Sequence, residues 1–196
     1  MLAISGRTST IAGELAALLP EWEQVKSADR PHELPLTAER YLFCNGLLLG
    51  IAPGHMTTDQ HAATWKANFA DIAEKCLDIL AANDRARIVV IGSESAYRGS
   101  FDGAYAEAKQ ALHRFVEGTR LAPGQQMVAI SPGIIENSGM TRRRKDQGAL
   151  RDRMFNHPKR RFLTALEVAR MAHFLLYIDE GYTSGVVIRM HGGDGR

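Results

Sequence analysis

The chain has 196 residues, of which 45% are hydrophobic and 23% are charged. This length and composition suit one globular domain with a sizeable core, and they exclude a disordered chain. The formal net charge of +2 is too small to indicate a nucleic-acid-binding protein.

The sequence carries no targeting or disulfide signal. The first residues contain no basic segment followed by a long apolar run, so no signal peptide is expected. The longest apolar stretch, 41–52, is broken by Asn45 and two glycines and is too short to span a membrane. Cys44 and Cys76 are the only cysteines, which favours a reducing, cytoplasmic setting.

The first part of the chain predicts a strand, a turn and a helix. Residues 2–5 are apolar, a polar turn follows, and apolar residues then recur at helical spacing until Pro20. Residues 22–26 are a candidate second strand. The stretch 27–39 contains two prolines and is interpreted as a loop.

Strands and helices alternate through the rest of the chain. Thr164 and Glu167 form a capping-box pattern that starts the last helix, and the basic segment 137–160 has only weak periodicity. Buried strands are expected at 41–46, 88–93, 127–131 and 185–190, and long helices at 58–82 and 104–121. Because these strands are apolar without alternation, the pattern predicts an α/β fold with a parallel sheet covered by helices on both faces.

Polar residues and glycines follow the predicted strands, where ligands bind in open α/β sheets. Further on, Tyr105 and Lys109 stand four residues apart in a predicted helix and therefore share one face. A tyrosine that exchanges its proton near neutral pH needs such a positive charge nearby. The residues at the strand ends are Ser5 and Gly6, Asn45 and Gly46, Ser93, and Pro132 and Gly133.

The ordered set of 88-IVVIGSESA-96, 105-YAEAK-109, 131-SPGIIEN-137 and the final 182-YTSGVVIRMHGGD-194 resembles the short-chain dehydrogenase/reductase family over nearly the whole chain. The resemblance implies a single Rossmann-type, doubly wound domain over 1–196. It also implies hydride transfer between a nicotinamide nucleotide and a carbonyl or alcohol.

The resemblance assigns catalytic roles to four residues. Tyr105 would be the general acid or base, and Lys109 would lower the tyrosine pKa and hold the cofactor ribose. Ser93 would orient the carbonyl oxygen, with Ser95 as its rival; the spacing to Tyr105 and the position directly after the strand favour Ser93. Asn68 would hold a water that links the lysine to solvent, or it is an ordinary surface residue of its helix.

The nucleotide loop departs from the family pattern. In 5-SGRTSTIA-12, Gly6 is kept, but Thr10 and Ala12 replace the later glycines. Hydroxyl groups beside a helix N-terminus still favour an anion, so cofactor binding is expected to persist. The cofactor-binding residues expected here are Gly6, Arg7, Thr8, Ser9, Thr10 and Ile11.

The region between the second and third strands is too short for the helix and strand that the family places there, so one crossover is expected to be shortened or missing. No acidic residue directly follows 22–25, whereas Arg7, Lys26 and Arg30 are near. This arrangement favours NADP(H), with NAD possible. The remaining cofactor-binding residues expected from the resemblance are Asn45, Gly46, Pro132, Gly133, Ile135 and Asn137, together with Tyr105 and Lys109.

Residues 137–163 lie where the family has a mobile substrate lid. The basic runs 142–145 and 159–161 are either solvated surface or the binding site of an anionic substrate. The histidines show no ligand spacing, so they are interpreted as structural and no metal site is expected.

The sequence therefore predicts an NADP(H)-dependent oxidoreductase acting on a small-molecule carbonyl or alcohol. The alternative is an inactive relative that binds nucleotide or senses redox state; an epimerase or dehydratase is a third possibility. The two long helices resemble those that form a dimer interface in the family, so a homodimer or homotetramer is expected. No nucleic-acid or membrane partner is expected.

Overall fold

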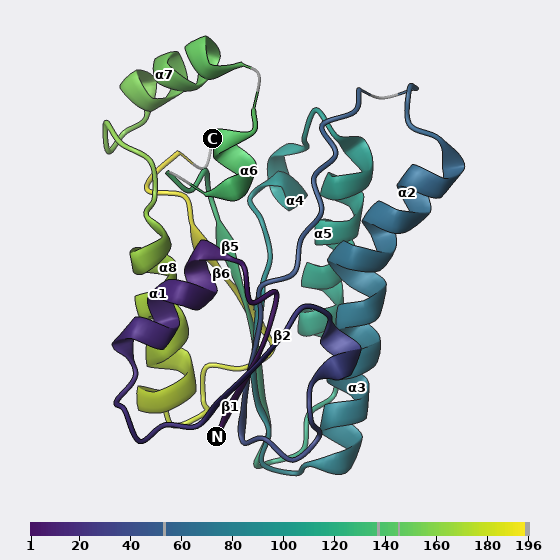
Figure 1. Cartoon of the computed structure of the whole chain (residues 1–196), viewed down its shortest axis with the longest axis vertical. Coiled ribbons are helices and arrows are strands. Elements are labelled where there is room, and N and C mark those ends of the chain that lie inside the picture. Colours follow the sequence, from purple (N-terminus) through teal and green to yellow (C-terminus); the bar gives the residue numbers. More distant parts are fainter. Residues whose placement is uncertain (53, 137, 145, 195–196) are drawn as a thin grey trace.

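Six parallel strands form the central sheet of the chain in a computed structural model, which describes residues 1–52, 54–136, 138–144 and 146–194 (Figure 1). Their order across the sheet is β2-β1-β3-β4-β5-β6. The predicted α/β fold with a doubly wound parallel sheet is confirmed. The strands are β1 (Leu2–Ser5), β2 (Val25–Ala28), β3 (Arg40–Phe43), β4 (Arg87–Ile91), β5 (Gln126–Pro132) and β6 (Val186–Met190).

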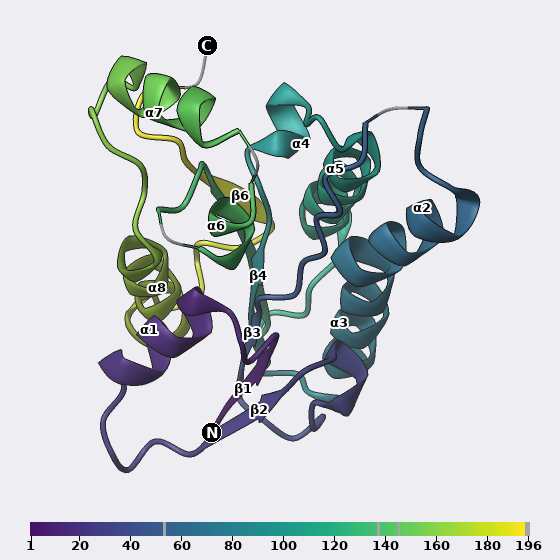
Figure 2. The same ribbon diagram turned by 45° about the horizontal axis from the view of Figure 1, so that its top comes forward.

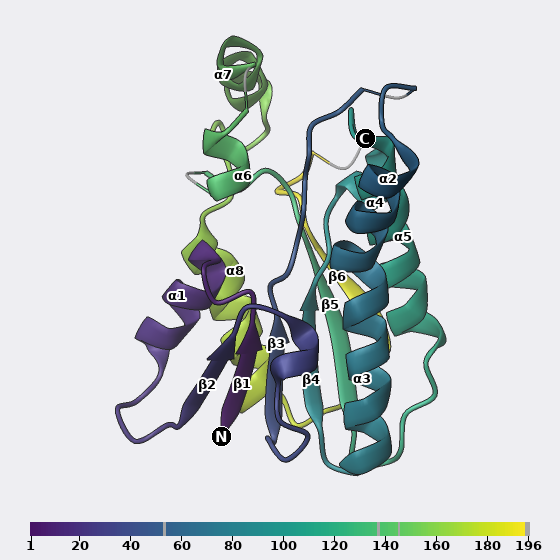
Figure 3. The same ribbon diagram turned by 45° about the vertical axis from the view of Figure 1, so that its right-hand side comes forward.

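Helices cover both faces of the sheet (Figures 1 and 3). On one face, α1 (Thr10–Leu18) packs against α8 (Ala165–His173). On the other face lie α2 (Thr58–Trp65), α3 (Asp71–Ala82) and α5 (Gly103–Gly118). A π-helical turn, Lys66–Ala70, joins α2 to α3, so the helix predicted over 58–82 is confirmed. A second π-helical turn, Phe174–Ile178, extends α8.

Two hydrophobic cores explain why the strands lack alternation. Leu2 and Ile4 of β1 face the core under α1 and α8, whereas Ala3 between them faces the core under α3 and α5. The same division recurs in β4, where Val89 and Ile91 face one core and Ile88 and Val90 the other. Side chains on both faces of the sheet are therefore buried.

The connection from β2 to β3 contains only a 3₁₀ turn, Pro31–Glu33, where a βαβ unit usually has a helix. Strands in dinucleotide-binding folds usually run in an order that begins 3-2-1-4. Without the third strand this order begins 2-1-4, which renumbers to the 2-1-3 that opens the order seen here. Leu34 and Ala38 of the connection are buried in the core under α3. The expected loss of one crossover is thus observed.

The second strand lies later in the sequence than predicted. It covers Val25–Ala28, not 22–26, and Lys26 pairs with Ala3 in the middle of the strand. The strand is mostly exposed at the sheet edge, so it lacks the apolar pattern that would have marked its ends.

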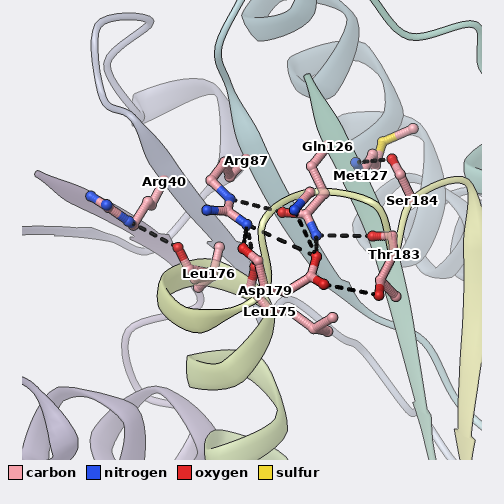
Figure 4. A network of polar contacts seen from close by, with 10 residues as sticks. Arg40, Arg87, Gln126, Met127, Leu175, Leu176, Asp179, Thr183 and Ser184 are labelled. Carbon is pink, nitrogen blue, oxygen red and sulfur yellow. Dashed lines mark hydrogen bonds and ion pairs between the residues drawn. The ribbon is translucent and has the colours of Figure 1, made fainter. Parts of the chain in front are cut away.

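A polar network closes the sheet at the amino-terminal ends of the strands, opposite the predicted site (Figure 4). The Arg87 guanidinium donates to the backbone carbonyls of Leu175 and Asp179, and Arg40 donates to that of Leu176. The Gln126 amide donates to the Asp179 carboxylate at 2.6 Å. The two arginines thus bind carbonyl groups that have no partner within the last helix. Their hydrogen bonds fix the turn between this helix and β6.

Two further helices, α6 (Gly139–Arg142) and α7 (Gln147–Asn156), lie in the segment predicted as a lid, above the carboxyl ends of the strands (Figure 2). Ile135 and Leu163 form a bridge at the base of this segment. Within the described residues, no helix is long and apolar enough to cross a membrane.

Candidate active site

The Lys109 side chain lies in the sheet interior at the carboxyl ends of the strands. It is only 2% exposed, although it belongs to a helix. Its ammonium group donates to the backbone carbonyl of Ile91 at 2.8 Å and to that of Asn45 at 3.3 Å. Burial lowers the pKa of Lys109 to about 8, and the Cys44 thiol works in the opposite direction.

Tyr105 lies on the same face of α5 as Lys109, and both are buried. The Lys109 nitrogen is 5.9 Å from the centre of the Tyr105 ring. Burial raises the pKa of the Tyr105 phenol; a hydrogen bond with the Ser93 side chain opposes this rise, and the Asp102 carboxylate adds to it. The pKa therefore moves opposite to the expected direction, because burial of the phenol outweighs the Ser93 hydrogen bond.

The β4–α4 turn places Ser93, not Ser95, against Tyr105. Ser95 begins the short helix α4 (Ser95–Arg98), and its backbone N–H donates to the Ser93 hydroxyl at 3.1 Å. Ser93, Tyr105 and Lys109 thus meet where a carbonyl oxygen could approach the hydroxyl and phenol together.

Asn68 is fully buried in the π-helical turn between α2 and α3. Its amide nitrogen donates to the carbonyls of Leu47 and Thr64 at 2.8 Å each, and its oxygen accepts from the Leu47 N–H at 3.1 Å. It is therefore not a surface residue. The π-helical turn directs it at the loop after β3, which it holds in place.

The loop after β1 brings the backbone of two strands together. Gly6 has a φ of +76°, and a Cβ there would lie 2.8 Å from the carbonyl carbon of Cys44, so only glycine fits. Ser9 caps α1 by accepting from the Ile11 N–H at 3.3 Å. Thr8 is exposed and Thr10 is the first residue of α1. This crevice between β1 and β3 offers a helix N-terminus to a diphosphate, so the residues fit a dinucleotide.

Asn45 joins this crevice to the edge of the sheet. Its side chain accepts from the Ser5 hydroxyl and donates to the Asp29 carbonyl at 2.9 Å, while its own carbonyl accepts from Lys109. Gly46 lies against both Asn68 and the lid, because a Cβ there would meet the Met140 methyl at 2.8 Å.

The end of β2 carries an acidic residue, contrary to the sequence-based expectation. Because the strand ends at Ala28, Asp29 directly follows it. Its carboxylate accepts from Arg7 at 2.8 Å, and both side chains are more than half exposed. Glu33 accepts from the backbone N–H groups of Asp29 and Arg30. Lys26 lies inside the strand and is not grouped with Arg7 and Arg30 at its end.

The loop after β5 supports both the site and the lid. The Pro132 carbonyl accepts from the Glu94 N–H at 3.0 Å, and the Gly133 N–H donates to Met190 of β6 at 3.0 Å. The Ile135 carbonyl accepts from the Thr141 hydroxyl at 2.8 Å, which attaches α6 to the loop. Asn137, expected to bind cofactor, lies outside the described residues.

Three buried polar residues near the site were not identified from the sequence. Asp102 accepts from the backbone N–H groups of Leu49, Gly50 and Tyr105. Burial opposes ionisation of Glu94, yet hydrogen bonds from Arg189 and Ser131 hold its pKa below the usual value. His113 is considered below. Each of the three lies one to four positions from a predicted site residue in the sequence. That proximity is the only sequence signal that could have marked them as part of the site.

Among the described residues, no group of three or more His, Cys, Asp or Glu side chains is arranged to hold a metal ion. Two of the basic lid residues form ion pairs at the surface. Arg144 pairs with Asp146, and Arg161 with Glu167. Arg142 and Arg151 line a cavity of about 180 Å³ under α7, together with Leu150 and Phe162.

Comparison with known families matches residues 53–194 to the family model described as enoyl-(acyl carrier protein) reductase. No curated protein sequence matches the chain.

Solved structures with the same fold cover nearly the whole chain. An oxidoreductase of the short-chain dehydrogenase/reductase family from Burkholderia thailandensis has a TM-score of 0.81 at 18% identity, over 98% of this chain and 91% of that one. A short-chain dehydrogenase/reductase (glucose/ribitol dehydrogenase) from Brucella melitensis has a TM-score of 0.79 at 20% identity, over 98% and 95%. ElxO with NADP bound also has a TM-score of 0.79 at 20% identity, over 98% and 97%.

Proposed function

Because the chain belongs to the short-chain dehydrogenase/reductase family, we propose that it transfers hydride between a nicotinamide nucleotide and a carbonyl or alcohol substrate. The observation that carries the proposal is the meeting of Ser93, Tyr105 and Lys109 at the carboxyl ends of β3 and β4. A module that only binds nucleotide has no need of a buried phenol beside a serine hydroxyl.

The roles follow from the donors available. A nicotinamide nucleotide held at the loop after β1 would supply hydride to the carbonyl carbon in reduction. The Tyr105 phenol donates its proton to the oxygen that becomes an alcohol, and the Ser93 hydroxyl donates a hydrogen bond to the same oxygen. The phenolate left on Tyr105 is stabilised by the Lys109 ammonium, whose charge acts strongly because the site is buried. Asn68 holds the loop after β3 in place beside these three residues through its hydrogen bonds to Leu47.

For the nucleotide, the position of Asp29 favours NAD(H) over the NADP(H) expected from sequence. A carboxylate at the end of the second strand accepts hydrogen bonds from ribose hydroxyls. It also repels a 2′-phosphate, and Glu33 adds a second negative charge there. Arg7 and Arg30 would bind such a phosphate only if Arg7 left its pairing with Asp29.

A titration with NADH and with NADPH, followed by nicotinamide fluorescence, tests the nucleotide site. We expect tighter binding of NADH, and a gain in NADPH affinity of about fivefold in Asp29→Ser, because removing one like charge from a partly screened site is worth about 1 kcal/mol. Asp59→Asn, in the first turn of α2, is the matched control. Tighter NADPH binding by the unmodified chain would reject the Asp29 assignment.

The substrate is proposed to be a small molecule that enters beneath α6 and α7. Carbonyl compounds and α,β-unsaturated thioesters both place negative charge on an oxygen during reduction, so both classes belong in an activity screen. An anionic substrate group is proposed to meet the lid arginines Arg142 and Arg151, which line the cavity under α7. Saturable nucleotide binding without turnover of any compound would favour the alternative of an inactive relative.

The chain is further proposed to act as a homodimer or homotetramer in the cytoplasm, through the helices α2, α3 and α5. Sedimentation that shows only monomer at micromolar concentration would reject this assembly.

A further inference from the structure

His113 extends the row of site residues on α5. It follows Tyr105 and Lys109 at four-residue intervals, so all three point to the carboxyl end of β4. Its side chain is buried, with only 3% of the residue exposed. The Tyr97 ring packs on it, with ring centres 5.3 Å apart.

The imidazole fills a gap in the backbone hydrogen bonds of the β4–α4 turn. The N–H groups of Gly92 and Glu94 donate to the carbonyls of Ile130 and Pro132 at the end of β5. The Ser93 N–H between them faces away from β5, and β3 pairs with β4 only as far as Phe43 and Val90. The Ser93 N–H instead donates to His113 Nε2 at 3.4 Å.

Gly92 is the residue that makes room for this contact. A Cβ at position 92 would lie 2.1 Å from His113 Nε2, closer than any contact between such atoms. Any other residue at this position would therefore displace the imidazole or the turn. Gly92 and His113 therefore act together: the glycine leaves the space in which the imidazole accepts the Ser93 N–H.

We propose that neutral His113 is a positioning residue for the reaction, accepting the Ser93 N–H so that the Ser93 hydroxyl is directed at the Tyr105 phenol. This inference rests on the proposed hydride transfer. Because Nε2 accepts, the ring proton must be on Nδ1, and a protonated imidazole would lose the acceptor. Burial opposes that protonation most strongly. Lys109 and Arg189 oppose it as well, while Glu94 favours it.

Kinetics of two His113 variants test the role. His113→Leu replaces the imidazole by an apolar side chain without an acceptor. We expect kcat to fall about 10- to 100-fold, since small displacements of a catalytic group have effects of that size. The Kd of the nucleotide should stay within about twofold, because no nucleotide-binding residue moves. His113→Gln, whose amide oxygen can replace Nε2, should recover most of kcat. Equal losses in both variants, or an unchanged kcat in His113→Leu, would overturn the proposal.

A glycine variant and an NMR measurement test the contact between His113 and Ser93 independently of the His113 variants. Gly92→Ala is expected to reproduce the kcat loss of His113→Leu while the histidine itself is kept, because the added Cβ would displace the imidazole. A fully active Gly92→Ala variant would also overturn the proposal. Nitrogen NMR of the unmodified chain near pH 7 should show the neutral Nδ1–H tautomer, and the Ser93 amide should exchange faster in His113→Leu. If the unmodified chain turns over no substrate, the proposed function fails, and the NMR result alone decides whether His113 holds Ser93; an Nε2–H tautomer would reject it.

Discussion

The Lys109 ammonium donates to the carbonyl oxygen of Ile91 at 2.8 Å, so the cation of the site is held by the last residue of β4. This bond fixes the ammonium between two strands before any ligand arrives. It also holds Lys109 in the interior, where burial lowers its pKa to about 8.

Replacing Lys109 by Met should weaken nucleotide binding and lower kcat/KM by at least about 100-fold, because charge stabilisation of this kind is usually worth that much. Lys66→Met, which removes an exposed lysine paired with Asp71, is the control and should change neither quantity.

Nucleotide affinity should decrease as the pH rises through about 8. The ammonium is charged below this pKa and loses its proton above it. Fluorescence titrations between pH 6.5 and pH 9.5 would show the decrease in the unmodified chain. A Lys109→Met variant should lack it, and a flat profile in the unmodified chain would show that the ammonium is not needed for binding.

Tyr105→Phe should lower kcat about a thousandfold, within the range expected for loss of a general acid, while the nucleotide Kd stays within about twofold. The ring remains buried, so the fold is retained. Ser93→Ala should also lower kcat, whereas Ser95→Ala should leave it nearly unchanged. A Ser95→Ala variant that is slower than Ser93→Ala would reverse the assignment of the two serines.

Gly6→Ala should lower the free energy of unfolding by roughly 1–3 kcal/mol and weaken nucleotide binding, because its positive φ and its contact with Cys44 leave no room for a side chain. Gly13→Ala offers a matched control inside α1, where an added Cβ meets nothing within 4 Å. That variant should be more stable by roughly 0.5–1 kcal/mol, since alanine favours helix over glycine. Urea unfolding of both variants measures the contrast.

Stability should fall as the pH drops from 6.5 toward 4, partly because of His113. Burial lowers the pKa of this imidazole to about 4, whereas the unfolded chain has the ordinary value of 6.5. The unfolded state therefore binds more protons in this interval, so acid favours unfolding. The full difference is on the order of 3 kcal/mol. Urea unfolding of His113→Leu should show a shallower loss over the same interval, and an identical slope would contradict the shift.

The sequence predicted the parallel sheet well because its strands are buried on both faces. The apolar runs around Val89 and Val128 have only one interpretation, and the capping box at Thr164 marks a helix start that the structure confirms. The missing crossover was also predicted, because the segment between the second and third strands is too short to hold a helix and another strand.

The ends of exposed elements could not be predicted in the same way. In β2, Val25, Lys26 and Ser27 are all exposed, so burial left no pattern there to read. Because the predicted strand ended two residues too early, Asp29 was assigned to a loop, and the nucleotide preference inferred from the sequence did not take its carboxylate into account. The role of His113 depended on a contact with Gly92 that spans two elements, and no local pattern contains it.

The short link between β2 and β3 leaves β2 as the outermost strand, with one side of its backbone unpaired. Such an edge invites pairing with another chain. Here the strand is four residues long and carries Lys26 at its centre. A lysine on a short edge strand is a known means by which proteins resist edge-to-edge association. We therefore expect the Lys26 charge to hinder edge-to-edge association of the shortened sheet.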